Sequence, residues 1–267
     1  MRLTPLRRAA ILIVPVALLA ACGDDSSSSG TTTTGGSTVK APAGLVADGT
    51  LTICSDTPYE PFEFQDDAGK DTGFDIDVVA AIGDTAGLGT KVIDLPFDGI
   101  LGSLAAGQCD LVASAVTITA ERAKQVDFSD PYFDADQSLL TAKDSGITKL
   151  ADLSGKKVGV QTGTTGEAYA KAHATGATVK SFEDVDGMFS ALASGDVVAL
   201  LQDLPVNFAR TQKDDKLTVV ETYKTGEQYG FAVKKGNTEL RDFLNTGLKS
   251  LHGDGTYDKL HTKYFGS

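Results

Sequence analysis

The chain has few residues of the kinds that build metal sites. Its 267 residues include three histidines and three cysteines. His173, His252 and His261 lie far apart, and none has a cysteine or carboxylate at the spacing of a metal ligand. We therefore expect no metal ion and no other cofactor in this protein.

Positive charge is also scarce. The chain has 24 lysines and arginines against 36 aspartates and glutamates, a formal net charge of −12. Three of those arginines precede the first apolar run, so a mature chain without them would carry −15. No cluster of lysine and arginine interrupts this acidic character. The balance disfavours nucleic acid as a partner and favours solubility.

The apolar run at the N-terminus is too short to span a membrane. It covers residues 9–21, follows three arginines and stops at Cys22, whereas a spanning helix needs about 20 apolar residues. The pattern predicts a signal peptide at residues 1–21. Leu19-Ala20-Ala21-Cys22 resembles the bacterial lipobox, in which the cysteine is acylated and becomes the first residue. An ordinary signal peptide with an unrelated cysteine is the alternative.

A polar segment follows the signal peptide. Residues 23–44 are largely Asp, Ser, Thr and Gly, with too few apolar side chains to offset the entropy of ordering them. We expect residues 22–44 to form a flexible tether on the outer face of the bacterial cell membrane. The lipid on Cys22 would be its only membrane contact.

Two further cysteines form an even pair in an oxidising compartment. Cys54 falls in a predicted strand, and Cys109 stands at the entrance to another. The favoured interpretation is a disulfide between neighbouring strands, and two buried thiols are the alternative.

From residue 50 onward, β-rich runs alternate with helical patterns. Strands are predicted at 50–54, 91–95 and 110–114, with helices at 75–86 and after Asp98 as N-cap. The pattern restarts with strands at 157–161, 178–182 and 197–201 and helices at 166–174 and 188–193. This α/β order predicts two lobes, each a mostly parallel sheet flanked by helices.

The remainder of the chain suggests how the lobes connect. A strand at 228–235, an amphipathic helix capped by Asn237 and a short helix at 257–265 need a partner surface. We expect them to return to the first lobe, so that the chain crosses near residues 139–143 and 221–228 and forms a two-strand hinge. Lobe 1 would then be residues 45–140 and 227–267, and lobe 2 residues 141–226.

Several motifs, each weak alone, occur together in one order and spacing. They are Pro58-Tyr-Glu-Pro-Phe-Glu-Phe64, Gly73-Phe-Asp-Ile-Asp77, Thr117-Ile-Thr-Ala-Glu-Arg122, Asp127-Phe-Ser-Asp-Pro-Tyr132, residues 155–165, Gln202-Asp-Leu-Pro205 and residues 253–259. In this combination the chain resembles the polar amino-acid-binding proteins of bacterial ABC importers, family 3 of the solute-binding proteins, with a type II periplasmic-binding-protein fold. The resemblance implies a monomer without catalytic residues, which captures a free amino acid by hinge closure and delivers it to an ABC importer permease.

A ligand carboxylate needs cationic and N–H donors. Arg122 follows the predicted strand 110–114 by a loop, and a guanidinium can grip a carboxylate through two parallel hydrogen bonds. The alternative is a surface pair with Glu121 or Asp127. The resemblance implies that Thr117 adds its hydroxyl and its amide.

The other lobe offers a second set of donors. Thr164 and Thr165 open a predicted helix, whose free N–H groups and dipole favour an anion. A simple N-cap at either residue is the plainer interpretation and is compatible with binding.

A ligand ammonium group needs acceptors. Asp203 follows the buried strand 197–201, where an unpaired carboxylate is costly, and in the family that it resembles the matching aspartate binds the amine. Alternatively, Asp203 merely caps the helix that starts at Leu204-Pro205. The resemblance implies that the backbone carbonyl of Ala115 is another amine partner.

The resemblance places the pocket for the ligand side chain at Asp56, Tyr59, Phe97 and Gln161. Aromatic rings can stack on a guanidinium, an imidazole or an amide. Asp56, with Glu60 and Glu63 nearby, favours a cationic or neutral polar amino acid, although relatives with this aspartate also take glutamine. The lack of a pocket lysine or arginine argues against glutamate and aspartate.

Two enzyme classes compete with binding. Ser154-Gly-Lys-Lys157 and Lys224-Thr225-Gly226 match short motifs of penicillin-binding proteins, but Ser154 leads into a predicted strand and not into a helix. The same fold hosts secreted cyclohexadienyl and prephenate-type dehydratases, which need a general acid in the cleft. Asp56 and Glu63 are the only candidates, and no base is paired with them. Binding is therefore preferred, and the dehydratase is the alternative.

Overall fold

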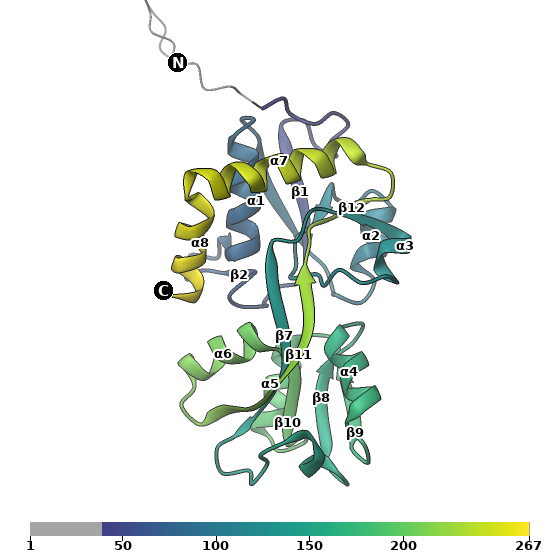
Figure 1. The fold of residues 1–267 in the computed structure, drawn as a ribbon, viewed down its shortest axis with the longest axis vertical. Coiled ribbons are helices and arrows are strands. Elements are labelled where there is room, and N and C mark those ends of the chain that lie inside the picture. Colours follow the sequence, from purple (N-terminus) through teal and green to yellow (C-terminus); the bar gives the residue numbers. More distant parts are fainter. Residues whose placement is uncertain (1–38, 267) are drawn as a thin grey trace, which may run out of the picture. The chain divides into compact units, whose positions relative to one another are not determined.

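The computed structural model describes residues 39–266. The predicted signal peptide, the predicted lipid anchor Cys22 and most of the predicted tether lie outside these residues. Within residues 39–266, no helix combines the length and the apolar character that crossing a bilayer would need. The described chain folds into two mixed five-stranded sheets and one two-stranded sheet (Figure 1).

The first sheet has the strand order β4-β1-β5-β12-β6. Its strands are β1 (Thr50–Ser55), β4 (Gly89–Asp94), β5 (Leu111–Val112), β6 (Val126–Phe128) and β12 (Ala232–Lys234). β1 pairs in parallel with β4 and β5, whereas β12 runs antiparallel to β5 and β6. A strand from the last quarter of the chain, β12, thus completes a sheet whose other strands come from the first half.

Helices cover both faces of this sheet. Leu51 and Ile53 of β1 pack in one cluster with α1 (Phe74–Asp84) and α7 (Thr238–Asp254), while Cys54 packs in another with α2 (Ile100–Ala105). This alternation is the period of a strand whose two faces are both buried. The last helix, α8 (Thr256–Phe265), packs on α1 and α7, and β2 (Phe64–Gln65) pairs with β3 (Asp71–Thr72).

The second sheet has the strand order β11-β7-β10-β8-β9. Its strands are β7 (Phe133–Ala142), β8 (Lys157–Gln161), β9 (Thr178–Phe182), β10 (Ala199–Asp203) and β11 (Leu217–Tyr229). β8 runs parallel to β9 and β10, and β7 runs antiparallel to β10 and β11. Between the strands lie the 3-10 helix η1 (Leu150–Leu153), α4 (Thr165–His173), α5 (Val185–Ala193) and α6 (Leu204–Lys213).

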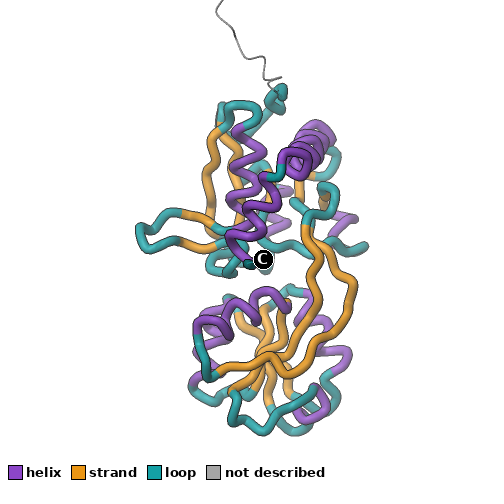
Figure 2. The backbone as a smooth tube through the Cα atoms, turned by 60° about the vertical axis from the view of Figure 1, so that its left-hand side comes forward, coloured by secondary structure: helices purple, strands orange, loops and turns teal. Residues whose placement is uncertain are grey.

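Two paired strands connect the sheets, as the predicted two-strand hinge requires. β7 pairs with β11 along its whole length, from Ala142 opposite Leu217 to Phe133 opposite Tyr229. Figures 1 and 2 show these two strands running side by side between the part of the chain that contains the first sheet and the part that contains the second. Gln137 already pairs with Asp203 inside the second sheet. The first crossing therefore lies before Gln137, earlier than the predicted residues 139–143. The predicted lobe boundaries fall inside β7 and β11 and stay a prediction.

Some predicted boundaries were wrong for local reasons. The N-cap of α2 is Gly99 and not Asp98, and Gly99 has a φ of 93°, a left-handed conformation that glycine adopts most readily. The predicted strand 228–235 is two strands, because the ladder of β11 ends at Tyr229 and β12 begins at Ala232. The residue between the two strands, Gly230, packs so closely that a Cβ atom at this position would lie 2.8 Å from the side chain of Ile118, so a larger residue would not fit without a shift.

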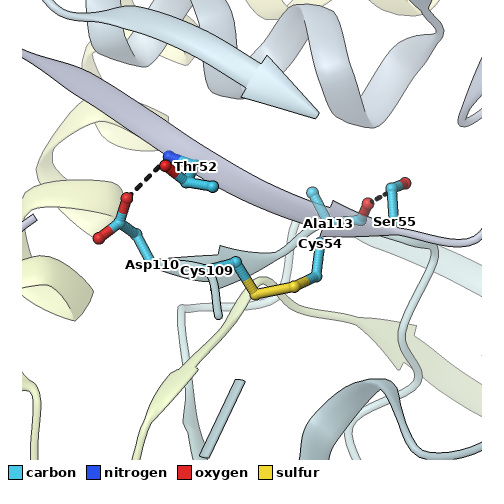
Figure 3. The surroundings of a disulfide bond; sticks show 6 residues. All are labelled: Thr52, Cys54, Ser55, Cys109, Asp110 and Ala113. Atoms are coloured by element: carbon cyan, nitrogen blue, oxygen red, sulfur yellow. Dashed lines mark hydrogen bonds between the residues drawn. A yellow bond between two sulfur atoms is a disulfide. The ribbon is translucent and has the colours of Figure 1, made fainter. Parts of the chain in front are cut away.

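A disulfide joins Cys54 of β1 to Cys109, which precedes β5 (Figure 3). The two Cα atoms lie 5.7 Å apart. The neighbouring Asp110 accepts a 2.7 Å hydrogen bond from the backbone of Thr52, and the Ser55 hydroxyl donates to the carbonyl of Ala113. The covalent bond and these hydrogen bonds hold β5 against β1, directly before the residues that line the site.

Candidate ligand-binding site

One cavity collects all ten residues that the sequence predicted for ligand binding. The space between its lining residues, part of which is open to solvent, is about 280 Å³. Its lining consists of Asp56, Tyr59, Glu63, Phe97, Ser114, Ala115, Thr117, Arg122, Gln161, Thr164, Thr165 and Asp203. These residues come from loops and strand ends of both sheets.

The fold explains why these residues meet. Asp56 directly follows β1, Ser114 lies just after β5, and Gln161 and Asp203 are the last residues of β8 and β10. Parallel strands end at one edge of a sheet, and ligands of open α/β sheets bind outside these carboxyl ends. The cavity is thus bounded by the carboxyl ends of both sheets.

Arg122 is the cation of the cavity. It begins the short helix α3 (Arg122–Gln125), and its guanidinium donates to the carbonyl of Thr117 at 2.8 Å and to the carbonyl of Gly163 at 3.1 Å. Its Cζ atom lies 5.1 Å from the centre of the Phe97 ring. Burial lowers the pKa of Arg122, and the charge of Asp203 opposes that effect.

The alternative for Arg122, an ion pair on the surface, is not what the structure contains. Glu121 pairs with Lys124, and Asp127 pairs with Lys235. The guanidinium instead contacts backbone carbonyls, one of which belongs to the loop after β8. Two carbonyls do not neutralise a cation, so Arg122 keeps a net positive charge for an anionic group.

The N-terminus of α4 lies at the same cavity. Thr164 is the N-cap, and its hydroxyl accepts a 3.0 Å hydrogen bond from the backbone N–H of Glu167. The capping role is therefore present beside any ligand role. The hydroxyl of Thr165 lies 3.4 Å from that of Thr117, so the two predicted donors approach each other across the cavity.

Asp203 is buried and well supplied with donors. The Tyr59 hydroxyl donates to it at 2.8 Å, the Tyr229 hydroxyl donates to the same oxygen, and the amide of Gln137 donates to the other oxygen. Burial raises the pKa of Asp203, while these hydrogen bonds and the charge of Arg122 lower it. Its side chain makes no capping hydrogen bond to α6. The capping alternative therefore does not account for its position.

Ala115 has an unusual backbone. It is the one non-glycine residue with a positive φ, 45°, within residues 39–266. Such a conformation costs energy for a residue with a side chain and is enriched at functional sites. The backbone N–H of Ala115 donates to Asp75 Oδ2 at 2.8 Å, which fixes this peptide at the cavity wall.

The predicted side-chain pocket contains an amide and a carboxylate in contact. The amide of Gln161 donates to Asp56 Oδ2 at 2.5 Å and to the carbonyl of Glu183 at 3.1 Å. Burial raises the pKa of Asp56 to about 6, the Gln161 hydrogen bond opposes this, and the charges of Asp94 and Asp184 add to it. Asp56 is therefore a carboxylate that a cation would help to ionise.

Two lining residues stand outside the ten predicted ligand contacts: Glu63, which the sequence placed near the pocket and named as a candidate general acid of the cleft, and Ser114, which it did not name. Glu63 is fully buried, and its Oε1 accepts a 2.9 Å hydrogen bond from the Ser114 hydroxyl. No donor faces Glu63 Oε2 within residues 39–266. Burial raises the pKa of Glu63 well above its usual range, and the charge of Asp75 raises it further. Ser114 could have been found from its place at the end of the predicted strand 110–114, the edge at which the other site residues were expected.

The places of possible metal ligands and of the short enzyme motif bear on the chemistry of the cavity. Across residues 39–266, no three histidine, cysteine, aspartate or glutamate side chains are grouped to hold a metal ion. Ser154 of the short penicillin-binding motif follows η1 and leads into β8, and it does not line the cavity. The chemistry of the cavity is that of hydrogen bonds and ion pairs.

Comparison with known proteins agrees with this architecture. A model of the bacterial extracellular solute-binding proteins, family 3, matches residues 51–267. The L-cystine-binding protein TcyJ of Escherichia coli K12 is 34% identical over 222 residues, which cover 82% of this chain and 84% of TcyJ. The histidine-binding periplasmic protein of Salmonella typhimurium is 32% identical over 229 residues, which cover 80% of this chain and 87% of the relative.

Solved structures give the same picture. An ancestral arginine-binding protein, bound to arginine in one structure and to glutamine in another, is 43% identical, with TM-scores of 0.77 and 0.78. These matches cover 82% and 83% of this chain and 99% and 100% of the ancestral chain. An ancestral amino acid-binding protein, described as a precursor of cyclohexadienyl dehydratase, is 42% identical, with a TM-score of 0.77. The match covers 81% of this chain and 96% of the ancestral chain.

Proposed function

Because the chain belongs to the bacterial extracellular solute-binding proteins of family 3, we propose that it binds a free amino acid in the cavity between its two sheets. The observation that carries the proposal is the presence of Arg122 and Asp203 in one small cavity. An amino acid bears its ammonium and carboxylate groups on the same α-carbon, so a cavity in which a guanidinium and a buried carboxylate both face the interior matches it.

The donors of the cavity would bind the ligand carboxylate, and its acceptors would bind the ligand ammonium group. The guanidinium of Arg122 would hold the ligand carboxylate, with the hydroxyl and N–H of Thr117 and the N-terminal N–H groups of α4 at Thr164 and Thr165 as further donors. Asp203 would accept from the ligand ammonium together with the carbonyl of Ala115. Each charged end of the ligand thus has a partner that is desolvated when the ligand enters, which strengthens both ion pairs.

The side-chain pocket favours a cationic or neutral polar amino acid. Asp56 and Glu63 add two carboxylates to a cavity whose one cation is already assigned to the ligand carboxylate. A guanidinium or imidazolium would favour the ionised form of these two groups, whose pKa values burial raises, and would supply a donor to Glu63 Oε2, which lacks one. Phe97 and Tyr59 offer aromatic faces on which such a group can stack. The arginine, histidine and glutamine named for relatives are of this class.

Transport follows from hinge closure. Lobe 1, residues 45–140 and 227–267, would contribute Arg122 and Thr117, and lobe 2, residues 141–226, would contribute Thr165 and Asp203. A ligand that contacts both lobes favours the closed form by its higher affinity for it. The closed monomer would deliver the amino acid to the permease of an ABC importer, while the lipid on Cys22 keeps it at the outer face of the membrane.

A ligand screen tests the proposal. Thermal unfolding of the mature protein is measured with each common amino acid at saturating concentration, and titration calorimetry follows for every hit. We expect L-arginine, L-histidine or L-glutamine to raise the melting temperature, and L-aspartate and L-glutamate to have no effect. If no amino acid binds, the proposed function is wrong. Turnover of prephenate-type compounds would instead favour the dehydratase.

A further inference from the structure

Gln137 contacts the site from behind without lining the cavity. It lies on β7, one of the two strands that connect the sheets, and its side chain has 0% exposure. Its amide nitrogen approaches one acceptor on each of three other elements. These are Asp203 Oδ1 at the end of β10, Glu227 Oε2 on β11 at 2.9 Å and Thr165 Oγ1 at the start of α4 at 3.3 Å.

The chemistry of the acceptors fixes the orientation of this amide. Ionised carboxylates only accept, so the nitrogen of Gln137 must face Asp203 and Glu227, and its two N–H groups suffice for both. The amide therefore bridges two like charges that would otherwise repel each other. The hydroxyl of Thr165 is held in the same arrangement, because it donates to Glu227 Oε2 at 3.1 Å.

We propose that Gln137 is a positioning residue, which holds the Asp203 carboxylate in place for the ammonium group of a ligand. Glu227 anchors Gln137 and the Thr165 hydroxyl from the second connecting strand. That an ammonium group of an amino acid is the partner of Asp203 rests on the proposed function. The hydrogen bonds of Gln137 to Asp203 and Glu227 do not depend on it. Two residues of the connecting strands thus set the geometry of two cavity residues, so the hinge and the site form one hydrogen-bonded unit.

The charges around Asp203 give this proposal a measurable signature. The groups that face it are the hydroxyls of Tyr59 and Tyr229, the Gln137 amide and the Arg122 guanidinium, and the nearby carboxylates of Glu63 and Glu227. Burial raises the pKa of Asp203, and the Gln137 hydrogen bond is one of the contacts that lower it. Removal of that donor should raise the pKa further. Removal of the Glu227 charge should lower it, because Coulomb repulsion acts on both carboxylates.

Two variants and a matched control separate positioning from general stability. Gln137→Met keeps the length of the side chain and removes both N–H donors. Glu227→Gln keeps an acceptor oxygen and removes the charge. The control is Gln228→Met, because Gln228 also donates its amide to a carboxylate across the same two strands, to Asp134 at 2.7 Å, but away from the cavity.

The first measurement needs no ligand. Carbon NMR follows the titration of the Asp203 carboxyl group in the free protein, with Asp203→Asn used to assign the signal. We expect the apparent pKa to rise in Gln137→Met, to fall in Glu227→Gln and to stay unchanged in Gln228→Met. An unchanged titration in Gln137→Met, with its fold verified by circular dichroism, would overturn the proposal. If that variant does not fold, Glu227→Gln decides, and the lack of a downward shift overturns it.

The second measurement uses L-arginine as the probe. Calorimetry at pH 7 should show an affinity about tenfold lower for Gln137→Met, the loss typical of one hydrogen bond to a charged group. Because the pKa of Asp203 should be higher in Gln137→Met, more of this carboxyl group is protonated in the free variant. L-arginine binding should therefore release more protons into the buffer than in the wild type. An equal loss in Gln228→Met would show a structural role and overturn the proposal. A wild type that binds no amino acid contradicts the proposed function, and the NMR titration then still decides the role of Gln137.

Discussion

Two groups of residues in the cavity differ in how fully the protein satisfies them. In the first group, which we call the zwitterion group (Arg122, Thr117, Thr165 and Asp203), Asp203 accepts from three side chains and Arg122 donates to two carbonyls. In the second, the side-chain group (Asp56, Glu63, Phe97 and Gln161), Glu63 has one donor and an oxygen with none.

The difference fits what each group would recognise. The carboxylate and ammonium are common to all amino acids, so a preorganised array of donors and acceptors can bind them at little reorganisation cost. A side chain varies, and buried acceptors that lack a donor select the ligand that brings one. Substitutions in the zwitterion group should therefore weaken all ligands equally, and substitutions in the side-chain group should change their ranking.

The largest effect is expected for Arg122→Ala. It leaves the ligand carboxylate desolvated without a cation, which costs about 2–5 kcal/mol for a buried charge pair. Affinities for L-arginine and L-glutamine should both fall, by a similar factor, in titration calorimetry. An unchanged affinity for either ligand would remove Arg122 from the zwitterion group.

Asp203→Asn should have the next largest effect. The substitution keeps the shape of the side chain but removes the charge that faces the ligand ammonium, and a hydrogen bond to a charged group contributes about 1.5–3 kcal/mol. Both ligands should again weaken equally. A loss confined to L-arginine would place Asp203 in the side-chain group and break the comparison.

Asp56→Asn should separate the ligands. A buried carboxylate can pair with a guanidinium but gains less from a neutral amide, so we expect about a tenfold loss for L-arginine and less than threefold for L-glutamine. Calorimetry of the two ligands on one preparation checks the ratio. Equal losses would contradict the assignment of Asp56 to the side-chain group.

The same residue should give L-arginine binding a pH dependence. The pKa of Asp56 is raised to about 6 by burial, and a cationic ligand binds its ionised form. Affinity for L-arginine should therefore be highest above pH 6 and fall as the pH drops through that value, because protonation removes the partner charge. Asp56→Asn should lack this component of the pH profile, and a profile identical to that of the wild type would rule out Asp56 as its source.

Much of this site could be predicted from the sequence, and the missing part has a physical cause. The family resemblance carried by the motifs named Arg122, Asp203 and the pocket residues, and the fold brings them together partly because Gln161 and Asp203 end strands that meet at one edge. Gln137 and Glu227 were missed, since they lie on β7 and β11, whose length comes from pairing with each other and not from a local pattern. Residues 224–228 of β11, Lys-Thr-Gly-Glu-Gln, contain no apolar side chain, so they show no hydrophobic alternation that would predict a strand.

The smallest effect, for Tyr59→Phe, tests whether the two groups are separable at all. Tyr59 was predicted for the side-chain pocket, yet its hydroxyl donates to Asp203 at 2.8 Å, so its ring and its hydroxyl belong to different groups. Phenylalanine keeps the ring and removes the donor. One hydrogen bond contributes about 1 kcal/mol, which corresponds to a change of about fivefold in affinity. We expect a loss of this size, equal for L-arginine and L-glutamine. A selective loss for L-arginine would mean that Asp203 also senses the ligand side chain, because only then would loosening that carboxylate change the ranking of ligands.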